Sequence, residues 1–261
     1  MKTFALIAKA SVACALFALM CAMGVAAERG HLVPAKYGDF GYYTFALTWQ
    51  PGICNFDGAS LTGAATPDFC SSDQPHAPLI GLHGLWASRP QSLIKANVPV
   101  QQWWSRGCDL YHHSDAAPPL SADLQAKLAA VMPHFRNNLL THEYDKHVQC
   151  FGFDPTQFFT TELAMRLAVA DAPFGRYLAA QAGHSVEHEN VVAAFEKSFD
   201  TTDARSVQLQ CVRDGTGRAV LTQFWITILA DRLALFPAAA SLSDIPIDQD
   251  TCPATFFIPS W

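Results

Sequence analysis

Residues 142–147 read HEYDKH, and four of their ionisable side chains, His142, Glu143, Lys146 and His147, fall on one side of a helix. At about 100° per residue on a helix, Lys146 lies about 40° from His142. Glu143 and His147 follow at about 100° and about 140°, on the same side of the helix. Two imidazoles, one ammonium group and one carboxylate would therefore share one side of a helix, an arrangement that can hold an anion and exchange protons with it.

This cluster has three interpretations, of which the simplest is a solvated polar face with an internal Glu143–Lys146 contact. The second is a zinc site, because His-Glu also opens the motif H-E-x-x-H. In that motif the histidines are four residues apart, so that both imidazoles meet one zinc. Here His142 and His147 are five residues apart, about 140° around the helix, and Lys146 would place a positive charge beside the metal. The spacing therefore argues against a metalloprotease, and we expect no metal site.

The third interpretation is acid–base chemistry at an RNA phosphate. Attack by a 2′-hydroxyl on the adjacent phosphate needs a base for the hydroxyl, an acid for the leaving oxygen and cations around the pentavalent centre. Histidine suits both proton transfers, because its unperturbed pKa is about 6.5. Acid and base must face each other across an in-line displacement, so a second histidine is required from another element.

His83 is the candidate for that second histidine. It lies in the apolar run LIGLHGLW, residues 79–86, which is typical of a buried strand. A core histidine hydrogen-bonded to the backbone is the alternative. Gly84 would allow close approach by a substrate. Trp86, two residues further on and on the same strand face, would either stack on a base or pack in the core.

These two segments together resemble the ribonuclease T2 family. Residues 81–88, GLHGLWAS, are similar to its first block, built on H-G-L-W-P, and residues 142–150, HEYDKHVQC, to its second, built on H-E-W-x-K-H-G-x-C. Residues 45–54, FALTWQPGIC, resemble its N-terminal strand. The resemblance implies an α+β fold in which several helices flank an antiparallel sheet core stapled by disulfides, and it implies no metal or cofactor.

The resemblance also implies a role for each ionisable residue. His147 would be the general base and His83 the general acid, and the two would exchange roles when the 2′,3′-cyclic phosphate intermediate is hydrolysed. Glu143 and Lys146 would stabilise the pentavalent transition state.

Two further side chains would bind the substrate, His142 at the phosphate and Trp86 in a base pocket. The implied activity is that of a metal-independent endoribonuclease. It would cleave single-stranded RNA to 2′,3′-cyclic phosphate and then 3′-phosphate ends, with low base specificity. We expect a monomer whose partner is the RNA substrate.

Three positions depart from the family blocks: Ala87 replaces a proline, Tyr144 a tryptophan and Val148 a glycine. None of them carries a proton, so we expect activity to survive, although Val148 directly follows the base and can shift the backbone there. A non-catalytic binding member of the family is the alternative. Retention of both His83 and His147 argues against it.

Hydrophobic patterning predicts the elements that must position these groups. Alternating apolar runs predict strands at residues 42–50, 79–86, 206–212 and 219–228, with a hairpin turn at residues 214–217. Helical periodicity predicts helices at residues 121–133, 135–149, 155–169 and 188–198, the first capped by Ser121. Strands and helices that do not alternate regularly indicate an α+β fold.

Residues 1–27 are predicted to be a signal peptide. Two lysines precede the apolar run 10–23, which is too short to span a bilayer, and small residues at positions 25–27 suit a signal peptidase. A lipoprotein anchored through Cys21 is the alternative, but Met20 is a poor fit directly before a lipidated cysteine. The alanine-rich leader favours a bacterial protein that is secreted or periplasmic.

Residues 28–261 are expected to form a single catalytic domain, because no linker or repeat divides them. Their six cysteines are an even number, which favours disulfides in an oxidising compartment. The loop over residues 53–78 would be closed by Cys54–Cys70. The family resemblance implies the other two pairs, Cys108–Cys150 and Cys211–Cys252.

The charge balance bears on how RNA would be bound. Without residues 1–27, 15 basic residues stand against 23 acidic ones, a net charge of −8. Such a balance argues against the broad cationic surface from which proteins gain bulk affinity for a polyanion. A local cationic site must therefore hold the phosphate. No later stretch is apolar enough to span a membrane, so no membrane contact is expected after the leader is removed.

Overall fold

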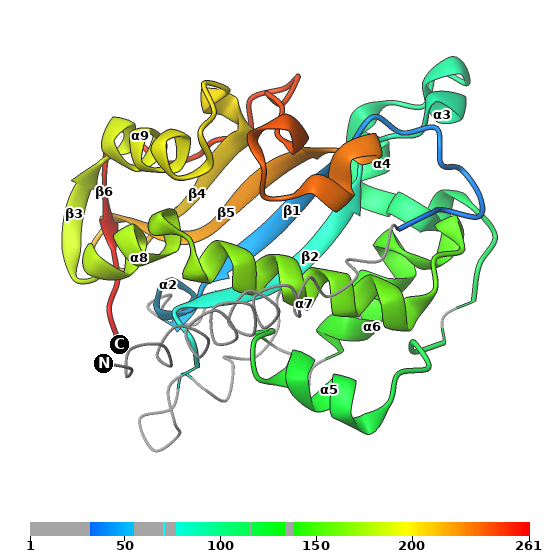
Figure 1. Ribbon diagram of the computed structural model, residues 1–261, viewed down its shortest axis with the longest axis horizontal. Coiled ribbons are helices and arrows are strands. Elements are labelled where there is room, and N and C mark those ends of the chain that lie inside the picture. Colours follow the sequence, from blue (N-terminus) through cyan, green and yellow to red (C-terminus); the bar gives the residue numbers. More distant parts are fainter. Residues whose placement is uncertain (1–31, 55–69, 71–76, 115, 134–137) are drawn as a thin grey trace, which may run out of the picture. The chain divides into compact units, whose positions relative to one another are not determined.

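The computed structural model of the protein describes residues 32–54, 70, 77–114, 116–133 and 138–261 (Figure 1). The segment predicted to be a signal peptide, residues 1–27, lies outside these ranges, as does most of the loop over residues 53–78. Across the described ranges, no helix combines the length and the hydropathy needed to cross a bilayer. Residues His31–Trp261 make up one unit.

Six strands form one sheet in the part of the chain that the structure describes, and they are β1 Tyr42–Trp49, β2 Ile80–Ala87, β3 His184–Glu187, β4 Val207–Arg213, β5 Ala219–Leu229 and β6 Thr255–Ile258. Their order is β2-β1-β5-β6-β3, with β4 also paired to β5. Paired strands are antiparallel, except that β5 and β6 meet in parallel. The expected antiparallel core is confirmed, and β3 and β6 are additions that the pattern did not predict.

The hairpin between β4 and β5 has the turn predicted at residues 214–217. The Asp214 carboxylate accepts hydrogen bonds from the backbone N–H groups of Thr216 and Arg218, both at 3.0 Å. Gly217 has φ +83°, a conformation that glycine adopts without strain. These bonds fix the turn that joins β4 to β5, and with it the register of the two strands.

The α-helices of the described chain are α2 Gln50–Cys54, α3 Gln91–Lys95, α4 Val100–Arg106, α5 Ala122–Ala129, α6 Leu139–His147, α7 Pro155–Asp171, α8 Pro173–Ala180 and α9 His188–Phe199. The predicted cap of α5 is present, since the Ser121 hydroxyl accepts from Leu124 N–H at 3.3 Å. Pro173 begins α8 directly after α7. The helices α2, α3, α4 and α8 were not predicted, and for the first three the reason is that five to seven residues are too few to show helical periodicity.

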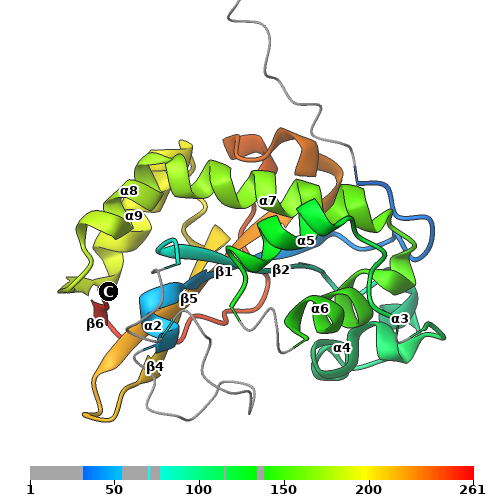
Figure 2. The same ribbon diagram turned by 90° about the horizontal axis from the view of Figure 1, so that it is seen from below.

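Helices α7, α8 and α9 lie on one side of the sheet (Figure 2). Phe174 of α8 joins this layer to the sheet, with its ring 5.3 Å from that of Phe195 on α9 and 5.5 Å from that of Phe224 on β5. The outer edge of β2 is also covered. Leu82 N–H donates to the Val131 carbonyl at 2.9 Å, so the strand that carries His83 is held on both edges.

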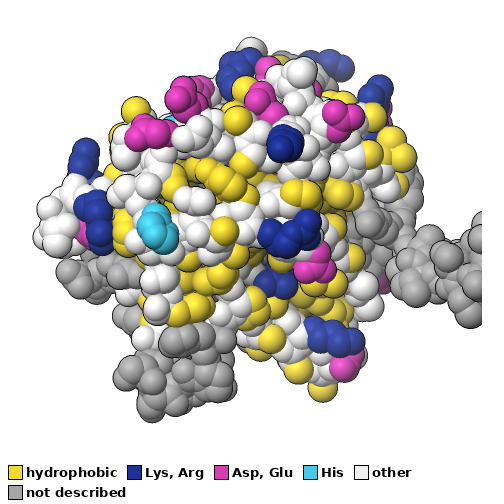
Figure 3. Space-filling model, turned by 60° about the vertical axis from the view of Figure 1, so that its left-hand side comes forward, with side chains coloured by type: hydrophobic (Ala, Val, Ile, Leu, Met, Phe, Trp, Pro, Cys, Tyr) yellow, Lys and Arg dark blue, Asp and Glu magenta, His cyan; other side chains and the backbone are white. Residues whose placement is uncertain are grey.

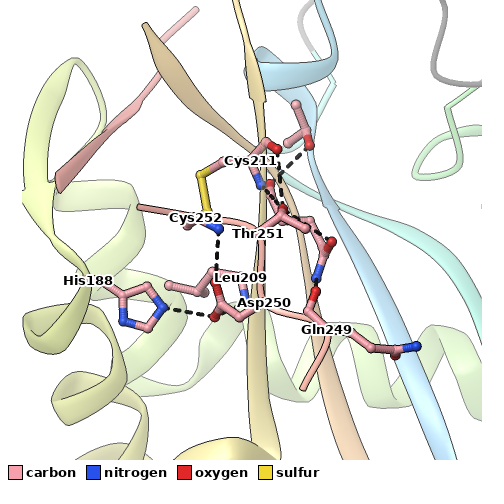
Figure 4. Close-up of a disulfide and its surroundings, with 9 residues drawn as sticks. His188, Leu209, Cys211, Gln249, Asp250, Thr251 and Cys252 are labelled. Atoms are coloured by element: carbon pink, nitrogen blue, oxygen red, sulfur yellow. Dashed lines mark hydrogen bonds and ion pairs between the residues drawn. A yellow bond between two sulfur atoms is a disulfide. The ribbon is translucent and has the colours of Figure 1, made fainter. Parts of the chain in front are cut away.

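Three disulfides tie segments that are distant in sequence, and they are the expected pairs Cys54–Cys70, Cys108–Cys150 and Cys211–Cys252. Around the third of them, the Asp250 carboxylate accepts from Leu209 N–H and Cys252 N–H, each at 2.9 Å (Figure 4). His188, at the start of α9, lies 2.8 Å from the same carboxylate. The C-terminal segment is thereby bound to both β4 and α9.

Candidate active site

His83 lies at a bulge between β1 and β2. The register shifts between Ala46 and Leu47, which leaves His83 without a partner on β1. In a regular strand His83 would point to the face opposite Gly84 and Trp86. A bulge inserts one extra residue and re-aims a side chain. The rings of His83 and Trp86 therefore lie on the same face and meet edge to face, 5.0 Å apart.

Helix α6 directs Glu143 toward this face of β2. Glu143 is only 2 % exposed. One carboxylate oxygen, Oε2, accepts from the indole N–H of Trp86 at 2.6 Å, and the other, Oε1, lies 3.4 Å from His83 Nε2. The interpretation of residues 142–147 as a solvated polar face is therefore wrong for Glu143, the residue nearest the strand.

Gly84 makes room for this carboxylate. A Cβ at Gly84 would collide with Glu143 Oε2 and would lie 2.6 Å from Trp86 Nε1. The sequence suggested that Gly84 admits a substrate. In the structure the space beside it is filled by Glu143, because α6 packs closely against β2.

His147, the last residue of α6, approaches the same indole from the helix. Its ring lies 5.3 Å from the Trp86 ring, inclined by 30°. Trp86 therefore contacts both His83 and His147, which come from different elements as an in-line acid–base pair requires. His142 is exposed at the edge of the site, with its ring 6.3 Å from that of His147. The structure thus brings together the strand and helix residues that the sequence singled out.

Burial sets the protonation of these groups. Burial and then the charge of Lys146 lower the pKa of His147 well below its ordinary value. Burial also lowers the pKa of His83, opposed by a hydrogen bond to Gln223. Burial raises the pKa of Glu143 to about 7, against the opposing hydrogen bond of Trp86. Neutral His147 and a Glu143 that is protonated below neutral pH follow from this arrangement.

The ligand atoms of His142, Glu143 and His147 lie within 4.8 Å of one another. The i, i+5 spacing indicated that the two imidazoles diverge by about 140° on a helix. The side chains nevertheless converge, because His147 is the last residue of α6 and its side chain turns inward toward Trp86. The angular argument against a shared metal was therefore too strong. Glu143 is already hydrogen-bonded to Trp86, and metal independence stays a prediction.

The end of α6 is held by a segment that sequence reasoning did not single out. Gly107 has φ +49°, and a Cβ there would collide with the carbonyl oxygen of Lys146. Its neighbour Cys108 is bonded to Cys150, just beyond the helix. Val148, which replaces the family glycine, has φ −123° and donates its N–H to the helix at 3.1 Å. That φ is negative, so the position does not require the left-handed conformation that favours glycine.

Two side chains of β5 also belong to the site, and sequence reasoning missed them. Gln223 Oε1 lies 2.9 Å from His83 Nδ1 and accepts from the Trp225 indole N–H at 3.1 Å. The Trp225 ring meets Trp86 edge to face at 5.5 Å. Their i, i+2 spacing placed both on one strand face, but nothing in the sequence indicated which strand that face meets.

A buried carboxyl on α7 lies behind Glu143. Glu162 is 1 % exposed and accepts a hydrogen bond from the backbone N–H of Leu85. Burial, followed by the charge of Glu143, raises the pKa of Glu162 well above its ordinary value. A glutamate among the apolar positions of α7 was the available signal, because a buried charge is costly unless it is paired.

Comparisons with known proteins match this arrangement. The model of the Ribonuclease T2 family matches residues 40–238. Ribonuclease I of Escherichia coli (strain K12) is 30% identical over 238 residues, which cover 85% of this chain and 87% of that protein.

Solved structures share the fold at lower identity. Ribonuclease MC1 from the seeds of bitter gourd has a TM-score of 0.52 at 19% identity, over 84% of this chain and 100% of its own. RNase NT in complex with 5′-AMP has a TM-score of 0.56 at 17% identity, over 85% and 98%. The family match spans β2 with His83 and α6 with His147, and the sheet and helices around them have the same fold as these structures. The chain belongs to the ribonuclease T2 family.

Proposed function

We propose that this protein is an endoribonuclease that cleaves single-stranded RNA by transesterification without a metal. The observation that carries the proposal is that His83 of β2 and His147 of α6 both contact the indole ring of Trp86, with the Glu143 carboxyl hydrogen-bonded to the same indole. Membership of the ribonuclease T2 family supports the same activity. The complex of RNase NT with 5′-AMP shows that a protein of this fold binds a nucleotide.

His147 would act as the base in the first step. Burial holds its pKa well below the ordinary value, so it is neutral and can accept the proton of the 2′-hydroxyl. His83 would donate a proton to the leaving 5′-oxygen. Its pKa is lowered less than that of His147, so on acidification His83 is protonated first. In the second step water attacks the cyclic phosphate, and the two histidines exchange roles.

Glu143, Lys146 and His142 would hold the phosphate. Below pH 7 Glu143 is largely protonated, because its pKa is about 7. A protonated carboxyl adds no negative charge next to the phosphorane and has an O–H that can donate to it. Lys146 brings positive charge to the same place, and His142 lies at its exposed edge.

The cationic site is local. Figure 3 shows a face of the molecule on which Lys and Arg side chains are interspersed with Asp and Glu side chains. This face agrees with the acidic composition, which argues against a broad cationic surface as the source of RNA affinity.

Base selection would rest on stacking. The Trp86 N–H is committed to Glu143, so its indole offers a ring rather than a hydrogen-bond donor to a base. Stacking on an aromatic ring accepts every base, which fits low base specificity.

Digestion of RNA by the purified protein in EDTA tests the proposal. Products ending in 2′,3′-cyclic phosphate, and later in 3′-phosphate, are expected between pH 4 and 8, with Trp86→Phe and wild type compared on four homopolymers for base preference. Absence of cleavage, or strict dependence on a divalent metal, would contradict the proposal. If the wild-type protein is correctly folded and still cleaves no RNA, it is a non-catalytic binding member of the family.

The proposed site of action is the oxidising space outside the bacterial cytoplasm. The cysteines that the structure describes form three disulfides, and such bonds persist in the periplasm or in the medium. We expect a monomer there. Fractionation of cells with a His83→Ala variant would report the compartment without toxicity from active enzyme.

A further inference from the structure

The second nitrogen of His83 is held from β5. Strand β1 lies between β2 and β5, and its residue Ala46 pairs with Gly84 on one side and with Trp225 on the other. The two small residues leave the face above β1 open. Gln223 and Trp225 can therefore reach across β1, to His83 Nδ1 at 2.9 Å and to the Trp86 ring at 5.5 Å.

The direction of these hydrogen bonds follows from the donors available. The Trp225 indole N–H can only donate, so the amide atom of Gln223 that it meets at 3.1 Å is the oxygen. The same oxygen lies 2.9 Å from His83 Nδ1 and cannot donate. Nδ1 must therefore carry the hydrogen, which leaves Nε2 as the nitrogen that gains and loses a proton.

We propose that Gln223, oriented by Trp225, is a positioning residue that fixes the tautomer and the ring plane of His83 so that Nε2 faces the phosphate site. This inference rests on the proposed function, in which His83 exchanges protons with RNA. Nε2 lies 3.4 Å from Glu143 Oε1, on the side where α6 presents its ionisable groups. The hydrogen bond at Nδ1 and the open nitrogen at Nε2 thus lie on opposite sides of one ring.

A neutral amide suits this role better than a carboxylate. The ionisable groups near His83 come from α6, namely Glu143, Lys146 and His147, whereas β5 presents Gln223 and Trp225, which do not titrate. A carboxylate at Nδ1 would add an attraction for the imidazolium and hold its proton more tightly. The amide orients the ring while leaving His83 acidic enough to release the proton to the leaving oxygen.

Three variants test the role through the pH dependence of kcat/KM. The hydrogen bond to Gln223 raises the pKa of His83. The acid must be protonated to act, so the alkaline limb of the profile follows that pKa. Gln223→Leu should therefore move this limb to lower pH and reduce kcat roughly ten- to a hundredfold. Gln223→Glu should move it to higher pH, and Trp225→Phe should shift it less, in the direction of Gln223→Leu.

The matched control is Gln210→Leu. Gln210 is a largely buried glutamine on β4 that pairs with Gln223 across the sheet, but its side chain donates to the Gln249 carbonyl at 2.7 Å and has no hydrogen bond to His83. The Gln210→Leu variant loses a comparable buried hydrogen bond, so its stability should fall about as much as that of Gln223→Leu. The alkaline limb of its kcat/KM profile should stay in place. A purely structural role of Gln223 would lower the rate equally at all pH values, as in this control.

Nitrogen NMR of His83 gives a readout that needs no activity. Wild type should show the Nδ1–H tautomer, and Gln223→Leu should show a mixture or the Nε2–H form. Gln223→Glu keeps an acceptor and so tests the inference even if Gln223→Leu fails to fold. An Nε2–H tautomer in wild type, or unchanged limbs in both Gln223 variants, would overturn it. A wild-type protein that cleaves no RNA but shows the Nδ1–H tautomer would refute the proposed function alone.

Discussion

The indole N–H of Trp86 donates to Glu143 Oε2 over 2.6 Å, and this bond joins β2 to α6 at the centre of the site. It satisfies a carboxyl that is almost fully buried. It also holds the Trp86 ring between His83 and His147. A residue expected to bind a base or to fill the core therefore also contacts both members of the proposed acid–base pair.

Removal of either histidine of the pair should abolish catalysis. His83→Ala and His147→Ala are each expected to lower kcat by about 10³-fold or more, because each proton transfer loses its group. His142→Ala should chiefly raise KM, because His142 is exposed at the edge of the site. Steady-state kinetics on a dinucleotide check this, with His184→Ala on β3 as the control. Near wild-type turnover in His83→Ala would contradict the assignment.

The activity should be greatest in mildly acidic solution. Activity needs neutral His147 and protonated His83, and burial lowers the pKa of both, His147 further than His83. The alkaline limb follows His83 and should lie below its ordinary value of about 6.5. A profile of kcat/KM against pH measures both limbs. An optimum above neutral pH would be incompatible with this pair of roles.

Glu143 should make the fold less stable as the pH rises. Its pKa is about 7 in the folded protein against an ordinary 4.5. Between these values the folded state holds a proton that the unfolded chain has lost, so raising the pH favours unfolding. The expected loss is about 3 kcal/mol across this window.

Glu143→Gln should remove that dependence, because glutamine does not titrate. Urea unfolding at pH 5 and at pH 8 measures the free energy of unfolding in both proteins. The residual slope in the variant reports the other buried groups, namely Glu162, whose pKa burial raises, and His83 and His147, whose pKa burial lowers. Equal slopes in wild type and variant would show that Glu143 is not the buried acid responsible.

Gly107→Ala should disturb the end of α6. The substitution combines a strained positive φ with a collision against the Lys146 carbonyl, and we expect about 2 kcal/mol of destabilisation together with reduced cleavage. Gly217→Ala is the control, since Gly217 has φ +83° but open space around a Cβ. It should cost about 1 kcal/mol and leave activity unchanged. Urea unfolding measures the loss of stability and an RNA cleavage assay measures the loss of activity. If both variants lose the same stability and the same activity, the collision with the Lys146 carbonyl is not the cause.

Residue type and local spacing indicated acid–base chemistry at a phosphate, with a solvated face and a zinc site as alternatives, and the family resemblance implied the individual roles. His142, Glu143, Lys146 and His147 share one side of a helix because helical geometry depends only on the nearby backbone. A required second histidine then singled out His83. The α+β class and the hairpin at residues 214–217 followed from periodicity in the same way.

Tertiary structure alone decided which of these side chains face one another. A one-residue bulge against β1 turned His83 to the face of Trp86, and strict alternation would have put it on the other. Gln223 meets His83 because β1 pairs with both β2 and β5, across 140 residues of sequence. Such contacts depend on which strands pair and in which register, and these are settled by the packing of the whole core rather than by any local segment. The sequence by itself determined which groups can react, and the sheet determined which of their nitrogens and oxygens meet.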